Sequence, residues 1–387
     1  MQFLYCVSFL FIENYVIIVI VLFIRGVNML KLIDVAKELN LNEKDLVFTN
    51  RRIYEGSFKS LDLKCNYVLK DKYNFNEPND EIIDEIFKDI KNIDFNRVIA
   101  IGGGSILDVG KLLALKDVDS TKKLFKRELP IIRDKELIIV PTTCGTGSEV
   151  TNISIVEIKS ENTKLGLAVD ELYADKGVLI PELCKTMPYK AFVYSSIDAL
   201  IHSIEGFLSP NSTPYTDLFA FKAIEMILSG YKEIIEKGEE YRNTIMDKFL
   251  IASNYAGIAF GNAGVGAVHA LSYPLGGKYH VPHGEANYQF LMAVLNFYKK
   301  NNGDGKISEL TKLISGIINA KEEDCYLELE NLLNNLIRRK NLKEYGMTID
   351  EIEKFSHSVM KNQQRLLKNN YVSMEIKDME EIYKSLY

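Results

Sequence analysis

The chain has 387 residues, of which 47% are hydrophobic and 26% are charged, and its formal net charge is −6. This length accommodates two domains of ordinary size, and the composition is that of a soluble globular protein. The acidic balance disfavours a nucleic-acid partner, because there is no surplus of Lys and Arg to neutralise phosphates. Five cysteines without a CxxC pair do not form a disulfide framework, which indicates a cytoplasmic location.

The N-terminal segment differs from the rest of the chain. Residues 1–28 are almost wholly apolar, interrupted by Glu13 and Asn14. No positive charge precedes this run and no small-residue cleavage site follows it. The stretch 15–24 alone is too short to cross a bilayer, and a longer span would bury Glu13. We interpret residues 1–28 as an extension before the natural start at Met29 and expect no membrane contact; a membrane-anchored binding protein is the alternative.

The next part of the chain, up to about residue 181, alternates short β-rich runs with amphipathic helical patterns. This alternation predicts a parallel, doubly wound α/β sheet. The expected strands are 46–49, 67–70, 97–101, 136–143 and 177–181, and the expected helices are 80–92 and 106–115. Two further segments, 154–159 and 165–169, predict a small hairpin beside the sheet.

After Pro188 the strand signals fade and long helical patterns follow. The expected helices are 190–208, 214–236, 240–260, 284–300 and 305–319, with several more toward the end. We therefore expect an α/β domain over residues 29–185 and an all-α domain over residues 186–387. Two domains form a cleft between them, and ligands usually bind there.

A glycine-rich turn lies between a predicted strand and a predicted helix and contains Gly102, Gly103, Gly104 and Ser105. Glycines let the backbone approach a ligand closely, and the start of a helix offers free N–H groups and a positive dipole end to a pyrophosphate. The GxGxxG fingerprint is absent, so a simple tight turn is the alternative. Three consecutive glycines exceed what a turn needs, which favours dinucleotide binding.

A second turn, 140–152, also follows a predicted strand and contains Thr142, Thr143 and Ser148 together with glycines. Hydroxyls and small residues at the carboxyl end of a strand suit contacts with ribose and nicotinamide. Cys144 lies in the same turn, but no base that could activate it is identifiable nearby. We interpret it as a partly buried thiol rather than a nucleophile.

Acidic and histidine side chains form a third group. Asp198 and His202 are four residues apart, which places them on one face of a helix. His269, His280 and His283 follow in one short stretch, in which we expect Pro274 and a glycine pair to interrupt the helix. One carboxylate and three imidazoles suit a divalent ion such as Fe(II) or Zn(II) with one position open for a substrate oxygen. Spacing alone leaves open which of the three later histidines are ligands.

Together these motifs resemble the iron-containing (group III) alcohol dehydrogenase family. The resemblance covers about Met29 to the C-terminus and rests on GGGSxxD (102–108), PTTCGTGSE (141–149), the Asp-x-x-x-His pair and the two later histidines, in the family's order. It implies the dehydroquinate synthase-like fold, in which an α/β domain binds NAD and an all-α domain binds the metal. Segments such as 209–217 and 279–288 are most similar to members that act on 4-hydroxybutyrate.

The resemblance also implies roles for individual residues. The metal ligands would be Asp198, His202, His269 and His283, and the family favours Fe(II), whereas intrinsic affinity favours Zn(II). The implied cofactor-binding residues are Asn50, Gly103, Gly104, Ser105, Asp108, Thr142, Thr143, Ser148 and Lys164.

Two positions depart from the family pattern. Many members have a histidine four residues after the third ligand, where this chain has Tyr273. A tyrosine relays protons less readily near neutral pH, because its ordinary pKa is about 10. Members that use NAD often have Asp at the end of the first strand, where this chain has Asn50. Asn still binds a ribose hydroxyl, and we therefore expect NAD rather than NADP, although Asn repels a 2′-phosphate less than Asp does.

The resemblance implies reversible hydride transfer between NAD(H) and the pair 4-hydroxybutyrate and succinate semialdehyde. Tyr273 and His280 are the candidate catalytic residues for proton delivery, with the nicotinamide ribose as the alternative route. Lys278 and His280 are candidates for binding the substrate carboxylate. The alternatives are a dehydrogenase of butanol, lactaldehyde or a similar small alcohol, and a dehydroquinate-synthase-like lyase. A homodimer is the family expectation.

Overall fold

The structure is a computed structural model that describes residues 11–12, 15–16, 37, 39–73, 75, 77–161 and 163–387. Two short strands near the N-terminus, β1 (Phe11–Ile12) and β2 (Tyr15–Val16), pair antiparallel. The rest of residues 1–28 lies outside the described residues, so the expectation that this segment precedes the natural start stays a prediction. Across the described ranges, none of the helices combines the length and the apolar character that crossing a bilayer requires.

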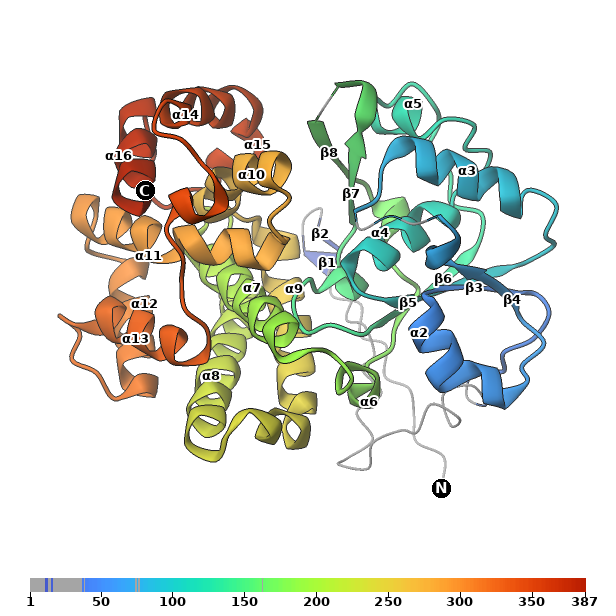
Figure 1. The fold of residues 1–387 in the computed structure, drawn as a ribbon, viewed down its shortest axis with the longest axis horizontal. Helices are drawn as coiled ribbons and strands as arrows, with labels where there is room; N and C mark the ends of the chain where they lie inside the picture. The colour runs from blue at the N-terminus through green and yellow to red at the C-terminus, as the bar shows by residue number, and fades with distance from the viewer. Residues whose placement is uncertain are drawn as a thin grey trace.

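A five-stranded sheet occupies the right half of the molecule in Figure 1, and all of its neighbouring strands are parallel. In spatial order the strands are β4 (Asn66–Leu69), β3 (Asp45–Thr49), β5 (Arg97–Gly102), β6 (Glu136–Pro141) and β9 (Lys176–Gly177). The order reverses between β3 and β5, so the crevice outside their carboxyl ends is where an open sheet of this kind binds a ligand. The predicted parallel α/β sheet is confirmed.

Both faces of the sheet are buried, and the middle positions of the central strands, 46–48, 98–101 and 137–140, are all apolar. On one face, Val98 and Ala100 pack with the helices of this half. On the other face, Ile99 and Ile101 pack with Phe58 and with residues that follow the sheet. The helices of this half are α2 (Arg51–Ile53), α3 (Asp80–Ile90), α4 (Gly104–Leu113) and α5 (Thr121–Phe125).

An antiparallel hairpin of β7 (Ile153–Ile158) and β8 (Thr163–Ala168) stands beside the sheet, as predicted. In Figure 1 it faces the helical half of the molecule. That half consists of α6 (Pro181–Cys184), α7 (Tyr189–Leu208), α8 (Pro214–Lys237), α9 (Met246–Ala263), α10 (Ala267–Tyr279), α11 (His283–Asn301), α12 (Lys306–Ile318), α13 (Cys325–Leu336), α14 (Glu351–Asn362), α15 (Gln364–Leu367) and α16 (Ile376–Leu386).

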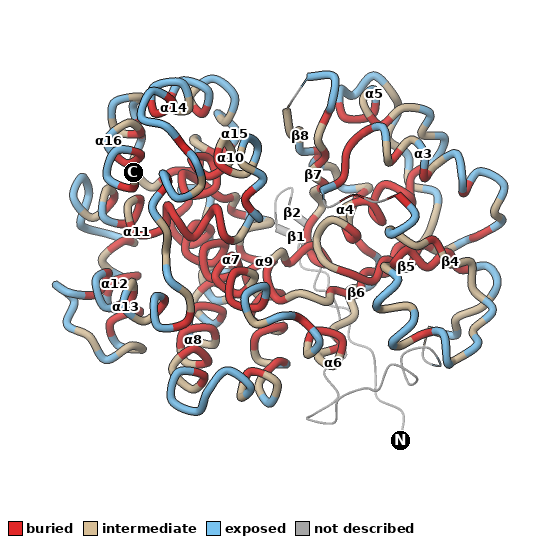
Figure 2. The backbone as a smooth tube through the Cα atoms, in the orientation of Figure 1, coloured by how far each residue is buried: buried red, intermediate tan, exposed pale blue. Residues whose placement is uncertain are grey.

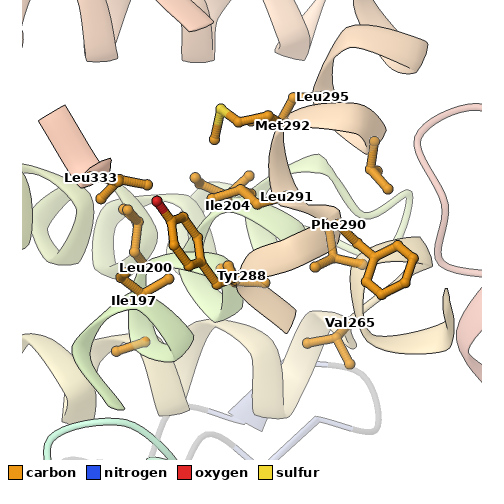
Figure 3. Close-up of a cluster of buried hydrophobic side chains, with 14 of the residues drawn as sticks. Ile197, Leu200, Ile204, Val265, Tyr288, Phe290, Leu291, Met292, Leu295 and Leu333 are labelled. Atoms are coloured by element: carbon orange, nitrogen blue, oxygen red, sulfur yellow. The ribbon is translucent and has the colours of Figure 1, made fainter. Parts of the chain in front are cut away.

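Helix α7 runs through the centre of the helical half and is buried along most of its length (Figure 2). Its side chains Ile197, Leu200 and Ile204 lie in one apolar cluster with Tyr288 and Leu291 of α11 (Figure 3). All five side chains are almost completely buried. Burial of this kind stabilises by about 1.5–3 kcal/mol per large side chain, so the polar groups on α7 are held on a rigid support.

Most predicted bounds agree with the structure to within two residues, and three predictions differ by more. The expected strand 177–181 is only two residues long, because Pro181 begins α6, where a proline fits the first helical turn. The expected helix 240–260 begins as a 3₁₀ segment (Glu239–Thr244). The expected interruption at Pro274 is wrong, since α10 continues to Tyr279. The chain reverses only at His280, which adopts the left-handed conformation.

Candidate active site

Four side chains from three helices converge in the cleft between the two halves. Asp198 and His202 come from α7, His269 comes from α10, and His283 is the first residue of α11. Each offers one ligand atom, and these atoms all lie within 4.8 Å of one another. The Oδ1 atom of Asp198 is 3.9 Å from Nε2 of His269 and 3.8 Å from Nε2 of His283. The structure thus brings together the four predicted metal-binding residues.

Close packing of α11 against α7 positions the fourth member of this cluster. Pro282 precedes α11 in an extended conformation, and His283 opens the helix. A Cβ atom at Gly284 would overlap the carbonyl oxygen of Tyr194 on α7. Only glycine therefore lets the start of α11 approach α7 closely enough to place His283 beside Asp198.

Hydrogen bonds to the far side of two imidazoles orient them toward the cluster. His202 donates from Nδ1 to the carbonyl oxygen of Gly145 at 3.1 Å, because a carbonyl can only accept. The Nδ1 atom of His269 lies 2.5 Å from one carboxylate oxygen of Glu205, and the other oxygen of that carboxylate accepts the N–H of Val268 at 2.7 Å. Both contacts leave Nε2 facing the cluster. Nε2 of His269 is buried and has no hydrogen-bond partner among the residues that the structure describes, which is the state a metal ligand requires.

The electrostatics of the cluster also suit a metal ion. Burial lowers the pKa of His202 to about 3 and lowers the pKa of His283, so both imidazoles are neutral near pH 7. Burial alone would raise the pKa of Asp198, but the neighbouring histidines and a hydrogen bond from Asn287 (2.7 Å) outweigh it and lower that pKa. A carboxylate and neutral imidazoles are the protonation states that bind a divalent ion. The donor set fits Fe(II) or Zn(II).

Three contributors to this cluster were missed at the sequence level. Glu205 and Asn287 hold ligand side chains by the hydrogen bonds given above. Phe260 of α9 stacks on the imidazole of His202, with ring centroids 4.0 Å apart. The only local signal for Glu205 was an acidic residue in an otherwise apolar helical run, on the same face as Asp198 and three residues after His202.

A cavity of about 430 Å³ joins this cluster to the predicted dinucleotide site. The helical half contributes all four residues of the cluster to its wall. The predicted cofactor-binding residues in the wall are Gly104, Ser105, Asp108, Ser148 and Lys164. The volume lies in the range of ligand pockets, roughly 300–1,000 Å³. One cavity therefore spans the turn expected to hold pyrophosphate and the cluster expected to hold the metal.

The glycine-rich turn has the form of an anion-binding helix start. Gly103 is the N-cap of α4, and its carbonyl oxygen accepts the N–H groups of Ile106 and Leu107. The N–H groups of Gly104 and Ser105 precede these and have no acceptor within the helix. A Cβ atom at Gly104 would lie 2.9 Å from Thr146, so a larger residue would crowd the approach. The turn thus offers backbone donors and the positive end of a helix dipole.

Asp108 connects the two turns. It is half-buried, and it accepts hydrogen bonds from Ser148 Oγ at 2.9 Å and from the N–H of Ile155 at 3.0 Å. Burial raises its pKa. The side chain therefore braces α4 against the second turn and the hairpin. On that hairpin, Lys164 forms an ion pair with Glu77, which also lines the cavity.

The other four predicted cofactor-binding residues do not line the cavity, and they are Gly103, Thr142, Thr143 and Asn50. Thr142 donates its N–H to Gly102 at 2.9 Å, and Thr143 packs against Gly103 in the neighbouring turn. Asn50 caps α2, accepting the N–H of Ile53 at 2.9 Å.

In the second turn, Cys144 is buried as expected, and burial raises its pKa to about 12. That thiol is not a nucleophile at neutral pH.

The two candidate catalytic residues occupy different environments. Tyr273 lines the cavity, and its ring centroid is 6.4 Å from that of His283. His280 is exposed at the end of α10, with φ 54°, and is absent from the cavity wall. Lys278, considered for the substrate carboxylate, instead forms an ion pair with Glu351. The structure places only Tyr273 beside the cluster.

Comparison with protein families agrees with this geometry. The family described as iron-containing alcohol dehydrogenase matches residues 23–181, and its C-terminal counterpart, Fe-containing alcohol dehydrogenase family, C-terminal, matches residues 192–387. The chain belongs to the iron-containing alcohol dehydrogenase family. It is therefore an enzyme of the oxidoreductase class, as predicted.

Three named proteins are similar to this iron-containing alcohol dehydrogenase in sequence or in structure. The 4-hydroxybutyrate dehydrogenase of Clostridium kluyveri is 52% identical over 91% of the chain and 95% of its own length. The NADPH-dependent butanol dehydrogenase of Clostridium saccharobutylicum is 32% identical over 71% of the chain and 72% of its own length. The structure of sulfoacetaldehyde reductase from Bifidobacterium kashiwanohense in complex with NAD+ has a TM-score of 0.79 at 23% identity and covers 91% of this chain and 93% of that one. The last comparison shows the shared fold.

Proposed function

We propose that this enzyme transfers a hydride reversibly between NAD(H) and the pair 4-hydroxybutyrate and succinate semialdehyde. The observation that carries the proposal is the 52% identity to a 4-hydroxybutyrate dehydrogenase over 91% of the chain. The small cavity, which joins a pyrophosphate-type helix start to a cluster of one carboxylate and three imidazoles, supports the same reaction.

In this proposal Asp198, His202, His269 and His283 hold a divalent metal ion, and the family favours Fe(II) over Zn(II). When bound, such an ion acts as a Lewis acid on an alcohol or carbonyl oxygen. The chain supplies the orientation: Glu205 and the carbonyl of Gly145 fix two imidazoles with Nε2 toward the substrate side. Stacking of Phe260 on His202 excludes water from that face.

The dinucleotide occupies the α/β side of the cavity in this proposal. The N–H groups of Gly104 and Ser105 bind the pyrophosphate, beside the N-cap Gly103. The other residues proposed to surround the cofactor are Asp108 as a brace, Thr142, Thr143 and Ser148 near the adenosine and nicotinamide moieties, Lys164 as a further cofactor contact, and Asn50 at the adenosine ribose. Asn50 uses its side-chain oxygen to cap α2, so its amide nitrogen is the group offered to a ribose hydroxyl. We propose NAD as the cofactor.

Proton delivery is assigned to Tyr273. Burial raises the pKa of its hydroxyl, so the group stays protonated and can donate a hydrogen bond to a substrate oxygen. Its ring lies next to His283 and in the cavity wall. The exposed position of His280 favours Tyr273 over it for this role. We further propose an NAD-binding domain over residues 29–185, a metal-binding domain over residues 186–387, a homodimeric assembly and a cytoplasmic location.

The test compares two aldehydes of equal chain length. The enzyme is purified anaerobically, its metal content is measured, and NADH oxidation is followed with succinate semialdehyde and with butyraldehyde. We expect iron in the purified protein and a higher kcat/KM for succinate semialdehyde. Butyraldehyde turnover as fast as that of succinate semialdehyde would refute the substrate assignment and would favour the butanol type of dehydrogenase, to which the chain is 32% identical.

A further inference from the structure

The cavity wall contains two cationic side chains, Lys164 and Arg365, among the residues that the structure describes. Lys164 already pairs with Glu77 in the same wall. Arg365 comes from α15, far along the chain in the helical half. Within the described ranges, no carboxylate lies at ion-pair distance from its guanidinium. The cavity therefore holds one cation whose charge no described acidic group neutralises.

Arg365 and Tyr273 both line this cavity. Tyr273 in turn neighbours His283 of the cluster. On the opposite side, Nη2 of Arg365 is 3.6 Å from the position that a Cβ atom at Gly166 would occupy. The guanidinium thus bridges the gap between α15 and the hairpin at the rim of the cavity.

The backbone that carries Arg365 is anchored although its side chain is exposed. The next residue, Leu366, is completely buried. The carbonyl oxygen of Arg365 accepts a hydrogen bond from Asn369 at 3.3 Å, and Asn369 also donates to Val265 O at 3.0 Å. Asn211 donates to Asn369 Oδ1 at 2.9 Å. Such anchoring fixes the position of the Arg365 backbone relative to the cavity.

We propose that Arg365 binds the carboxylate of the substrate and makes the enzyme selective for an ω-hydroxy acid over an uncharged alcohol; this inference rests on the proposed function. In 4-hydroxybutyrate the carboxylate is separated from the reacting carbon by three carbon–carbon bonds, so both ends fit in one small cavity. A guanidinium binds a carboxylate through two parallel hydrogen bonds, which fixes the direction of the chain. Lys278 is excluded from this role by its ion pair with Glu351.

The test uses Arg365→Gln, Arg365→Lys and a matched control, Lys368→Gln, which removes a positive charge from an exposed position at the end of the same helix. For each holoenzyme, kcat and KM are measured for succinate semialdehyde, butyraldehyde and NADH. A hydrogen-bonded charge contributes enough that Arg365→Gln should lower the ratio of kcat/KM for succinate semialdehyde to that for butyraldehyde by about 10- to 150-fold. Arg365→Lys should restore part of the ratio, and Lys368→Gln should leave it unchanged.

The outcomes separate this inference from the proposed function. A wild-type enzyme that turns over succinate semialdehyde selectively, with an Arg365→Gln variant of unchanged ratio, overturns the role of Arg365 and leaves the reaction intact. A wild-type enzyme without selectivity for succinate semialdehyde overturns the proposed function itself. An increase confined to the KM for NADH in Arg365→Gln also overturns the inference, because it assigns the guanidinium to a phosphate of the cofactor.

Discussion

Replacing Glu205 by Gln should weaken metal binding although Glu205 is not a ligand. The carboxylate accepts two hydrogen bonds, one from His269 Nδ1 and one from the N–H of Val268, and it is buried. A glutamine has one accepting oxygen and one donating nitrogen, so it can keep only one of these bonds. If it keeps the bond to Val268, its N–H₂ group faces Nδ1 of His269 and favours the tautomer that carries the proton on Nε2.

That tautomer cannot bind a metal through Nε2, the atom that faces Asp198 at 3.9 Å. Loss of an outer hydrogen-bond partner of a ligating histidine weakens metal affinity by about 10- to 100-fold, or about 1.4–2.7 kcal/mol. The dissociation constant of Zn(II) or anaerobic Fe(II) is measured by competition with a chelator of known affinity. Thermal unfolding of the metal-free variant shows separately whether the fold is intact.

The matched control is Glu149→Gln. Glu149 is also buried and accepts a hydrogen bond from Asn254 at 2.9 Å, but it contacts no residue of the cluster. We expect this variant to bind metal like the wild type. Equal metal affinity in Glu205→Gln and wild type, with both folded, would refute the reasoning that Glu205 selects the tautomer of His269.

Other substitutions test other parts of the structure. His269→Ala and His283→Ala should each lose bound metal on gel filtration while His280→Ala keeps it, since only His280 lies outside the cluster; metal loss in all three would contradict the assignment. Burial opposes ionisation of Glu351, but hydrogen bonds to its carboxylate outweigh this and hold its pKa at about 2, below its ordinary 4.5. The stabilising effect of ionised Glu351 is therefore present above pH 4.5 and is lost as the pH falls toward 2. In urea unfolding, Glu351→Gln should lose less free energy of unfolding between pH 6 and pH 3.5 than the wild type does. Equal losses in the two proteins would argue against this role of Glu351. Asn50→Asp should keep the helix cap and should lower the ratio of kcat/KM for NADPH to that for NADH about fivefold. The reason is that the added carboxylate repels the 2′-phosphate of NADPH by about 1 kcal/mol. An unchanged ratio would place the 2′-phosphate elsewhere.

The parts of the fold that were predictable from the sequence are those set by local patterns. Short apolar runs that alternate with helical patterns along the chain identify the strands of the parallel sheet. The four-residue spacing of Asp198 and His202 places both side chains on one helix face. The convergence of His269 and His283 follows from features that periodicity does not reveal. Helix α10 continues through Pro274, and the chain reverses one residue after the helix, at His280.

Arg365 illustrates what spacing cannot show. It lies in a helix of four residues, well separated along the chain from every motif, and it reaches the cavity only because α15 packs beside α10. Lys278 was favoured because it lies close in sequence to the metal stretch. In the structure its ammonium group points to Glu351 on α14 instead. Proximity along the chain misled here because a helix separates neighbouring residues onto opposite faces.

The carbonyl group of Gly145 belongs to the turn that we assign to the dinucleotide, yet it accepts the hydrogen bond that orients His202 in the metal cluster. One peptide group therefore serves both sites. By thermodynamic linkage, whatever factor bound metal imposes on the affinity for NADH, bound NADH imposes equally on the affinity for the metal. Wherever that factor exceeds one, the NADH-bound enzyme would hold the metal more tightly than the free enzyme does, so metal shortage would empty the free enzyme first.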